Sequence, residues 1–110
     1  MVQPRLATRR LLLRPFTFAD ARHVETLAGD ARVARGSVRI PHPYPSGLAA
    51  RWIACHEVAW QSGSGVYYAV TGKDSGELQG SVSLQLAERR LADGKMAYVG
   101  TLGYWLGVDY

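Results

Sequence analysis

Residues 78–106, LQGSVSLQLAERRLADGKMAYVGTLGYWL, decide the fold class because apolar residues alternate in them with polar or small ones. This period of two predicts β-strands over 78–87 and 96–106. The Asp93-Gly94 pair between them is typical of a hairpin turn. Residues 66–71 predict a further strand, and residues 73–76 predict the turn that joins it to the strand at 78–87. The second half of the chain is therefore predicted to be a three-stranded meander.

The strand at 78–87 has two chemically different faces. One face carries the apolar residues Val82, Leu84 and Leu86, and the other carries the polar residues Ser81, Ser83 and Gln85. Successive side chains of a strand point to opposite sides of the sheet, so the two sets are predicted to be separated by the sheet.

The first half of the chain predicts one strand followed by helices. Residues 9–15 form a short strand that ends at its proline, which lacks a backbone donor. The segment Thr17-Phe18-Ala19-Asp20 is a capping-box pattern that opens a helix, and this helix continues to Ala28. Gly29 is its predicted stop, and residues 30–35 can add another turn.

A proline-rich loop and a second helix come next. Residues 37–45 contain three prolines within five positions, so they predict a stiff extended loop. Ser46 is predicted to cap a helix that ends near Ser62, before Gly63. The apolar stripe of this helix consists of Leu48, Trp52, Cys55 and Ala59, with Ile53, His56 and Trp60 on its shoulder. We expect Cys55 to pack in the core, because neighbours on a helix do not face each other as a nucleophile and its base must.

The order of elements is strand, two helices and three strands, which predicts one α+β domain over residues 1–110 with a mixed or antiparallel sheet. The single cysteine excludes an internal disulfide and a multi-cysteine zinc site, and the three histidines show no ligand spacing, so no metal is expected. The chain has no apolar run of the roughly 20 residues that a membrane span needs. We therefore expect a cytoplasmic protein that does not bind membranes.

Charge is spread unevenly along the sequence. Residues 1–51 hold nine arginines and three carboxylates, whereas the remainder carries a small negative excess. A basic region can bind nucleic acid or an anionic cofactor. The arginines are scattered through predicted strand, helix and loop, so we interpret them as surface charge and do not favour a nucleic-acid partner. RNA or ribosome binding through this arginine-rich front is a third, weaker hypothesis.

Five segments, in this order, carry a resemblance to a known family. They are Thr8 to Ala21 (TRRLLLRPFTFADA), Pro41 to Tyr44 (PHPY), Trp52-Ile53, Gly76 to Val82 (GELQGSV) and Leu102 to Leu106 (LGYWL). Together they resemble the GNAT superfamily of N-acetyltransferases, of the RimJ/RimL-like kind that acetylates ribosomal-protein N-termini. The resemblance covers almost the whole chain and implies the N-terminal half of the GNAT (acyl-CoA N-acyltransferase) fold, truncated after its fourth strand.

The resemblance also implies the functional groups. Such enzymes transfer acetyl directly from acetyl-CoA, a co-substrate, to a primary amine of a protein N-terminus or a small molecule. Backbone at Leu106, Gly107 and Val108 would contact the pantetheine arm and thioester. Tyr104 and Trp105 would lie beside the acceptor amine, and the loop with His42 and Tyr44 would form the acceptor-side wall.

Two departures from the family pattern affect the expected activity. Relatives commonly carry Glu just before the LGYW segment, where this chain has Thr101, so the catalytic residue is unknown. The Gln/Arg-x-x-Gly-x-Gly/Ala turn that holds the pyrophosphate is also missing from the sequence. We therefore expect an incomplete fragment that binds acetyl-CoA weakly. The alternative is a non-enzymatic short paralogue that pairs its exposed last strand with a partner or with a second copy as a homodimer.

Overall fold

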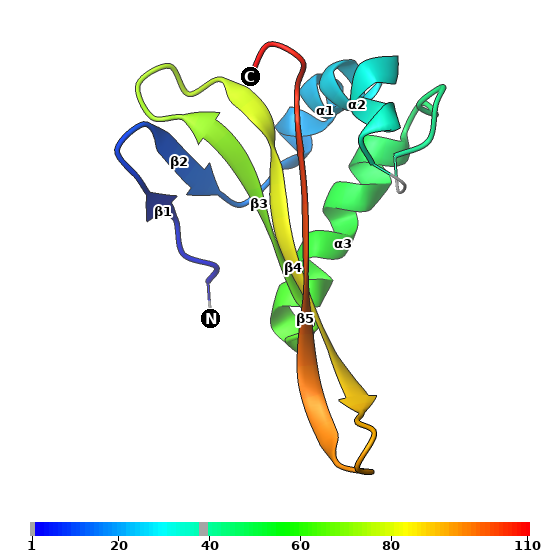
Figure 1. The fold of residues 1–110 in the computed structure, drawn as a ribbon. Coiled ribbons are helices and arrows are strands. Elements are labelled where there is room, and N and C mark those ends of the chain that lie inside the picture. Colours follow the sequence, from blue (N-terminus) through cyan, green and yellow to red (C-terminus); the bar gives the residue numbers. More distant parts are fainter. Residues whose placement is uncertain (1, 38–39) are drawn as a thin grey trace.

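The sheet is antiparallel throughout. A computed structural model describes residues 2–37 and 40–110, and in them five strands pair in the order β1-β2-β3-β4-β5 (Figure 1). The strands are β1 (Leu6–Ala7), β2 (Leu11–Arg14), β3 (Gly65–Gly72), β4 (Leu78–Arg90) and β5 (Met96–Leu106). The predicted α+β class is confirmed. The prediction missed β1, since two residues are too short for a period of two to be recognised.

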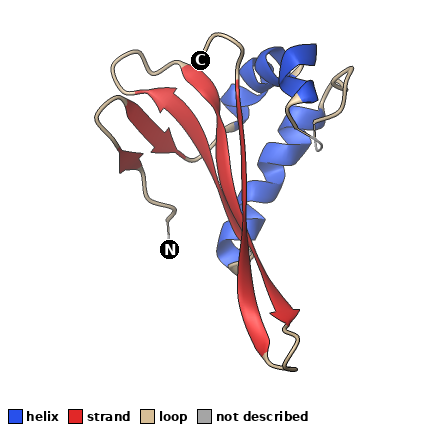
Figure 2. Cartoon of the chain, viewed as in Figure 1, coloured by secondary structure: helices blue, strands red, loops and turns tan. Residues whose placement is uncertain are grey.

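Helices cover one face of this sheet (Figure 2). They are α1 (Ala21–Ala28), α2 (Ala31–Arg35) and α3 (Leu48–Ser62), and a 3₁₀ turn, η1 (Phe18–Asp20), precedes α1. The core between the layers consists of Phe16, Val24, Ala28, Ala49, Ile53, Ala69 and Leu78. The ring of Phe16 meets Trp52 edge-on, with centroids 5.0 Å apart. The helix ends at Ala28 and Ser62 fall where the sequence predicted them.

An ion pair joins the first strands to the helical layer. The guanidinium of Arg14 in β2 donates two hydrogen bonds of 2.8 Å to the carboxylate of Asp20, one to each oxygen. The backbone N–H of Thr17 also donates to Asp20, at 2.8 Å. Burial by itself raises the pKa of Asp20, but the hydrogen bonds from Arg14 and Thr17 outweigh it, and the pKa lies below its usual value. The predicted capping box thus holds a buried carboxylate against an arginine that the sequence pattern did not identify as its partner.

The start and the buried face of α3 differ from the prediction. Gly47, with a φ of 82°, is the N-cap in place of Ser46, and its N–H donates to the carboxylate of Glu25 at 3.1 Å. The buried side of the helix consists of Ala49, Ile53 and His56. Cys55 is exposed, so its expected core position is wrong. The true stripe is rotated by about one residue, because it includes His56, which a hydrophobicity pattern places outside an apolar face.

The long β4–β5 hairpin extends well beyond the rest of the molecule (Figure 1). In its register Leu84 pairs with Leu102 and Val82 with Tyr104. The apolar residues of these pairs point away from the helices, and Leu102 and Tyr104 are 66% and 72% exposed. The polar set that includes Ser81 and Ser83 faces the helices instead. The sheet therefore separates the two sets as predicted, with the polar set on the covered side.

Candidate functional site

A pocket of about 400 Å³ lies between the sheet and the helical layer. Its helical side is formed by Val24, Ala28, Leu48 and Trp52, and its loop side by Ser37, Ile40, Pro41 and Tyr44. The sheet contributes Tyr67 from β3, Ser81, Ser83 and Gln85 from β4, and Thr101 to Trp105 from β5. The aromatic residues among them are Tyr44, Trp52, Tyr67, Tyr104 and Trp105, so the pocket has aromatic walls and a floor of hydroxyl and amide groups.

The polar floor follows from the alternation of β4. Ser81, Ser83 and Gln85 occupy every second position, so they share the face that α1 and α3 cover. Small side chains at Ser81 and Ser83 leave space that larger ones would fill, and Ser81 is only 3% exposed. Polar groups on the covered face of a sheet are unusual, and together with the pocket they make this face a candidate binding surface.

Tyr67 is the most constrained side chain of the pocket. The Nε2 amide of Gln85 donates a hydrogen bond of 2.9 Å to its hydroxyl oxygen. The ring of His56 stacks on it with centroids 4.3 Å apart and planes within 6° of parallel. Trp52 presents its ring at nearly a right angle, 88°, at a centroid distance of 6.0 Å. These contacts fix both the position and the plane of the phenol.

His56 supports this cluster as a neutral ring. It is 6% exposed, and among the described residues neither of its ring nitrogens has a hydrogen-bond partner. Burial lowers the pKa of His56 to about 4, because a charged imidazole loses its hydration there. His56 is thus uncharged at neutral pH, and its ring packs against the neighbouring aromatic rings.

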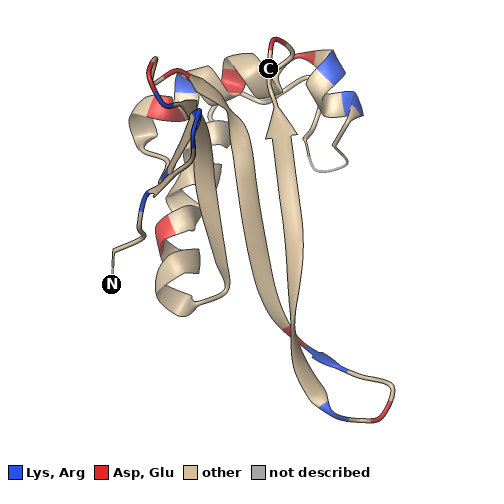
Figure 3. Ribbon diagram, turned by 60° about the vertical axis from the view of Figure 1, so that its left-hand side comes forward, with Lys and Arg blue, Asp and Glu red and all other residues tan. Residues whose placement is uncertain are grey.

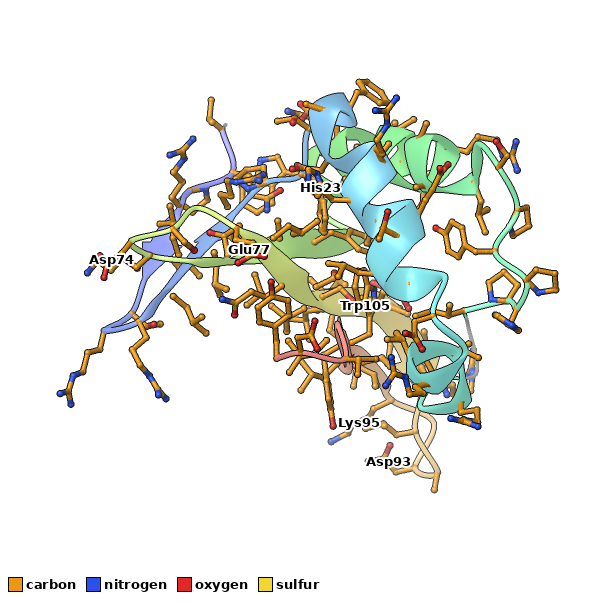
Figure 4. All side chains as sticks on the ribbon, turned by 90° about the horizontal axis from the view of Figure 1, so that it is seen from above. His23, Asp74, Glu77, Asp93, Lys95 and Trp105 are labelled. Carbon is orange, nitrogen blue, oxygen red and sulfur yellow. The ribbon has the colours of Figure 1, made fainter. Side chains whose placement is uncertain are left out.

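The structure brings together some of the predicted site residues. Tyr44, Tyr104 and Trp105 line the pocket, and Figure 4 shows Trp105 beside α1. Tyr44 and Trp105 pack against the core, whereas the side chain of Tyr104, the neighbour of Trp105 on the strand, is largely exposed. His42 is exposed and does not line the pocket. The sequence reasoning did not single out Tyr67, Ser83 or Gln85 as site residues, although the polar face of β4 was their signal.

The three residues predicted to contact acetyl-CoA lie past the pocket, at the end of β5. The N–H of Gly107 donates to the carbonyl of Gln79 at 2.8 Å, and its own carbonyl accepts from the N–H of Tyr110 at 3.0 Å. Leu106 and Val108 are partly exposed. The backbone N–H and C=O of Gly107 are therefore hydrogen-bonded within the chain, and contact of Leu106, Gly107 and Val108 with acetyl-CoA stays a prediction.

The helix N-termini do not fit the pyrophosphate of acetyl-CoA either. Asp20 holds its carboxylate at the turn that leads into α1, and the carboxylate of Glu25 accepts from the N-cap of α3. A carboxylate at these positions takes the backbone donors that an anion needs and opposes a second negative charge. Within residues 2–37 and 40–110, the N-termini of α1 and α3 therefore do not provide the phosphate-binding part of such a site.

Candidate bases are also scarce around the pocket. Thr101 lines it at the position discussed above, and the described lining residues include no carboxylate. Burial, with a smaller contribution from Glu25, raises the pKa of Tyr44, so this phenol stays protonated. Among the described residues no group of three or more His, Cys, Asp or Glu side chains could hold a metal ion. In the same part of the chain, no helix has the length and apolarity to cross a bilayer.

An antiparallel sheet with helices on one face and a pocket beside its last two strands defines an α+β domain with one candidate binding site. A sequence profile of the family described as "Acetyltransferase (GNAT) domain" matches residues 10–110. The chain belongs to this family, and its fold is the GNAT fold, as predicted. No curated protein matches the sequence.

Solved structures share the fold at low identity. An acetyltransferase from Agrobacterium tumefaciens C58 has a TM-score of 0.68 and 19% identity over 98% of this chain and 57% of its own. A protein described as a ribosomal-protein-serine acetyltransferase from Vibrio cholerae has a TM-score of 0.62 and 22% identity over 96% and 56%. FdhC, described as a nucleotide-linked sugar GNAT, has a TM-score of 0.68 and 18% identity over 99% and 57%. The chain thus spans less than two thirds of the length of each.

Proposed function

We propose that this chain forms the acceptor side of an N-acetyltransferase active site, in which acetyl passes from acetyl-CoA to a primary amine. The observation that supports this most directly is the aromatic-walled pocket with its polar floor, in a chain of the GNAT family. A protein N-terminus is the favoured acceptor, in keeping with a RimJ/RimL-like cytoplasmic enzyme, and a small-molecule amine is the second choice. The proposal treats the chain as an incomplete enzyme domain.

The residues of the pocket suit an amine that enters in its neutral form. Aromatic and aliphatic walls at Trp52, Trp105 and Leu48 can bury the apolar part of an acceptor. The hydroxyls of Ser83 and Thr101 can exchange hydrogen bonds with its polar groups. An amine must lose a proton before its lone pair can attack a carbonyl, and an α-amino group with a pKa near 8 does so more readily than a lysine side chain.

Binding of the acceptor can be tested directly because the chain is small enough for NMR. We expect a short peptide with a free N-terminus to shift the amide resonances of residues that line the pocket, such as Tyr67, Ser83 and Thr101. The same peptide with an acetylated N-terminus is the matched control and should bind more weakly. Shifts that map elsewhere, or equal binding of the two peptides, would contradict the proposed acceptor site.

The donor side gives a second prediction. We expect the 110-residue chain to bind acetyl-CoA weakly or not at all. The N-termini of α1 and α3 face carboxylates, and the backbone N–H and C=O of Gly107 are already hydrogen-bonded within the chain. Isothermal titration calorimetry measures this. An affinity in the micromolar range, about −8 kcal/mol, would show that the residues present suffice for the cofactor. Sequencing the gene downstream of codon 110 tests the fragment interpretation, since an in-frame phosphate-binding turn would support it.

A non-enzymatic interaction module is the alternative, and one observation favours it. β5 is the last strand in the sheet order, and its outward side chains include Tyr98 at 75% exposed and Leu102 at 66%. An open strand edge with apolar neighbours invites pairing with another strand. The occupant we consider is a second copy of this chain, which would form a homodimer.

A further inference from the structure

We infer that Tyr67 is a specificity-determining residue of the acceptor pocket: its hydroxyl donates a hydrogen bond to a carbonyl oxygen next to the acceptor amine. The ligand class that follows is an α-amino carbonyl compound, such as an amino-acid amide or a peptide N-terminus, in preference to a simple alkylamine or polyamine. This inference rests on the proposed function, because it takes the pocket as the place where the amine binds.

The Tyr67 hydroxyl accepts a hydrogen bond and keeps its own proton free to donate. The amide of Gln85 donates to the hydroxyl oxygen of Tyr67 at 2.9 Å, so this oxygen is the acceptor of that bond. A phenol that accepts a hydrogen bond still carries its own proton, which must be donated elsewhere. Because Tyr67 lines the pocket, the remaining direction for that proton is toward whatever occupies the pocket.

The Tyr67 side chain is held firmly by its neighbours. His56 stacks on one face of the Tyr67 ring, and Trp52 packs against it edge-on. The backbone carbonyl of Tyr67 accepts a hydrogen bond of 2.8 Å from the side chain of Gln3, which ties this part of β3 to the N-terminal segment. A donor fixed before binding loses little freedom when a ligand arrives, so its hydrogen bond discriminates between ligands.

The Tyr67 hydroxyl needs an acceptor atom on the ligand. A simple alkylamine offers no acceptor besides its own nitrogen, whose lone pair must stay free for the attack, so a reactive alkylamine leaves the Tyr67 proton unpaired when it excludes water from the pocket. A carbonyl two bonds from the amine accepts that proton while its apolar side chain lies against Trp52 or Trp105. Sites built to pair a ligand's polar group reject the analogue that lacks it.

Two probes that differ in the carboxamide group that carries this carbonyl test the inference. L-Phenylalaninamide and 2-phenylethylamine share the amine and the ring, and NMR titration of the wild-type chain gives the ratio of their dissociation constants. We expect Tyr67→Phe to reduce the preference for the amide by roughly 2- to 10-fold, the usual effect of one neutral hydrogen bond. Comparing the ratios of the two proteins cancels the different protonation of the two probes. An unchanged ratio in Tyr67→Phe would overturn the inference.

Tyr68→Phe is the matched control, because this neighbouring phenol donates to the carbonyl of Pro4 at 2.6 Å rather than into the pocket. It should leave the ratio of the two probes unchanged, even if it lowers stability. Should Tyr67→Phe fail to fold, Gln85→Met releases the hydroxyl from its amide and should also lower the ratio. An unchanged ratio in a folded Gln85→Met would overturn the inference in the same way.

The outcomes separate this inference from the proposed function. If both probes bind in the pocket with a ratio that Tyr67→Phe does not alter, the acceptor pocket stands and the role of Tyr67 falls. If neither probe shifts the resonances of the pocket, the acceptor site itself is wrong, and the inference falls with it.

Discussion

His56 is a buried histidine that makes stability depend on pH. Its pKa falls to about 4 in the folded chain, from an ordinary value near 6.5, because burial disfavours the charged ring. The unfolded chain therefore binds a proton at a higher pH than the folded chain does. As a result, the free energy of unfolding decreases as the pH falls from 6.5 toward 4. Since each pKa unit corresponds to ~1.4 kcal/mol, the loss reaches roughly 3 kcal/mol at pH 4.

We predict that His56→Leu removes this part of the acid sensitivity. The free energy of unfolding, measured by urea denaturation between pH 4 and pH 7.5, should fall less steeply in the variant than in the wild type. His23→Leu, at an exposed position on α1, controls for loss of a histidine and should retain the wild-type slope. Identical slopes for wild type and His56→Leu would show that His56 titrates normally.

Asp20 is the second residue with a distinct energetic role. Asp20→Asn keeps the size of the side chain but removes the negative charge to which Arg14 and the Thr17 N–H both donate hydrogen bonds. Arg14 is then left half-buried beside a neutral amide, so we expect a loss of roughly 2–4 kcal/mol in the free energy of unfolding at pH 7. Because the pKa of Asp20 is lowered by folding, wild type and variant should converge as the pH falls below 4.

Asp30→Asn is the matched control for Asp20→Asn. Asp30 also pairs with an arginine, Arg32, at 2.8 Å, but both side chains are far more exposed. Solvent screens such a pair, and asparagine can keep the N-cap bond to the Arg32 N–H, so the change in stability should be much smaller. Equal effects of the two substitutions in chemical denaturation would contradict the account of the Arg14–Asp20 pair.

At the scale of elements, the sequence predicted strands and helix ends better than helix faces. Gly29 and Gly63 follow α1 and α3 where predicted; Gly63 takes the left-handed φ of 75° that favours glycine, whereas Gly29 keeps an ordinary φ of −73°. The buried face of α3 depends on what the sheet presents to it, and His56 enters the core against the rings of Phe16 and Tyr67. The predicted stripe is centred on Cys55 with His56 only on its shoulder, whereas these ring contacts bring His56 into the core and leave Cys55 exposed.

Gly80 lies where β4 and β5 leave no room for a side chain. A Cβ built at this position would lie 2.2 Å from the carbonyl oxygen of Trp105 and 2.9 Å from the Cα of Leu106, both backbone atoms of β5. We predict that Gly80→Ala pushes the end of β5 away from β4, which costs roughly 1–3 kcal/mol in stability and displaces Trp105 from the pocket. Thermal denaturation and the emission maximum of tryptophan fluorescence measure the two effects.

Gly36→Ala serves as the control for Gly80→Ala. A Cβ at Gly36 would have its nearest neighbour at 3.6 Å, an ordinary contact, and its φ of −88° is open to any residue. We expect it to be close to neutral in stability. A Gly80→Ala protein as stable as Gly36→Ala would mean that β5 can move aside without cost.

At the scale of the whole molecule, charge and apolar surface are segregated. Figure 3 shows charged residues on the helices, on the N-terminal strands and at both ends of the β4–β5 hairpin, while the middle of β4 and β5 is drawn without charge. The sequence predicted the class and the meander, because alternation is local. It could not tell which face of β4 the helices cover, and therefore could not place Ser83 or Gln85 in a pocket. That choice depends on contacts between residues that are far apart in the chain.

The exposed face of the hairpin gives the final prediction. Its outward residues Leu84, Leu86, Leu102, Tyr104 and Leu106 form one apolar surface across two paired strands. If a second copy covers this surface, light scattering after size-exclusion chromatography should show a monodisperse dimer, and Leu102→Lys should convert it to a monomer because a buried lysine lacks a partner there. Val58→Lys places the same charge on an exposed apolar position of α3 and should leave the dimer intact. A wild-type chain that aggregates without a defined size would favour the incomplete enzyme, since an uncovered apolar sheet then has no specific partner.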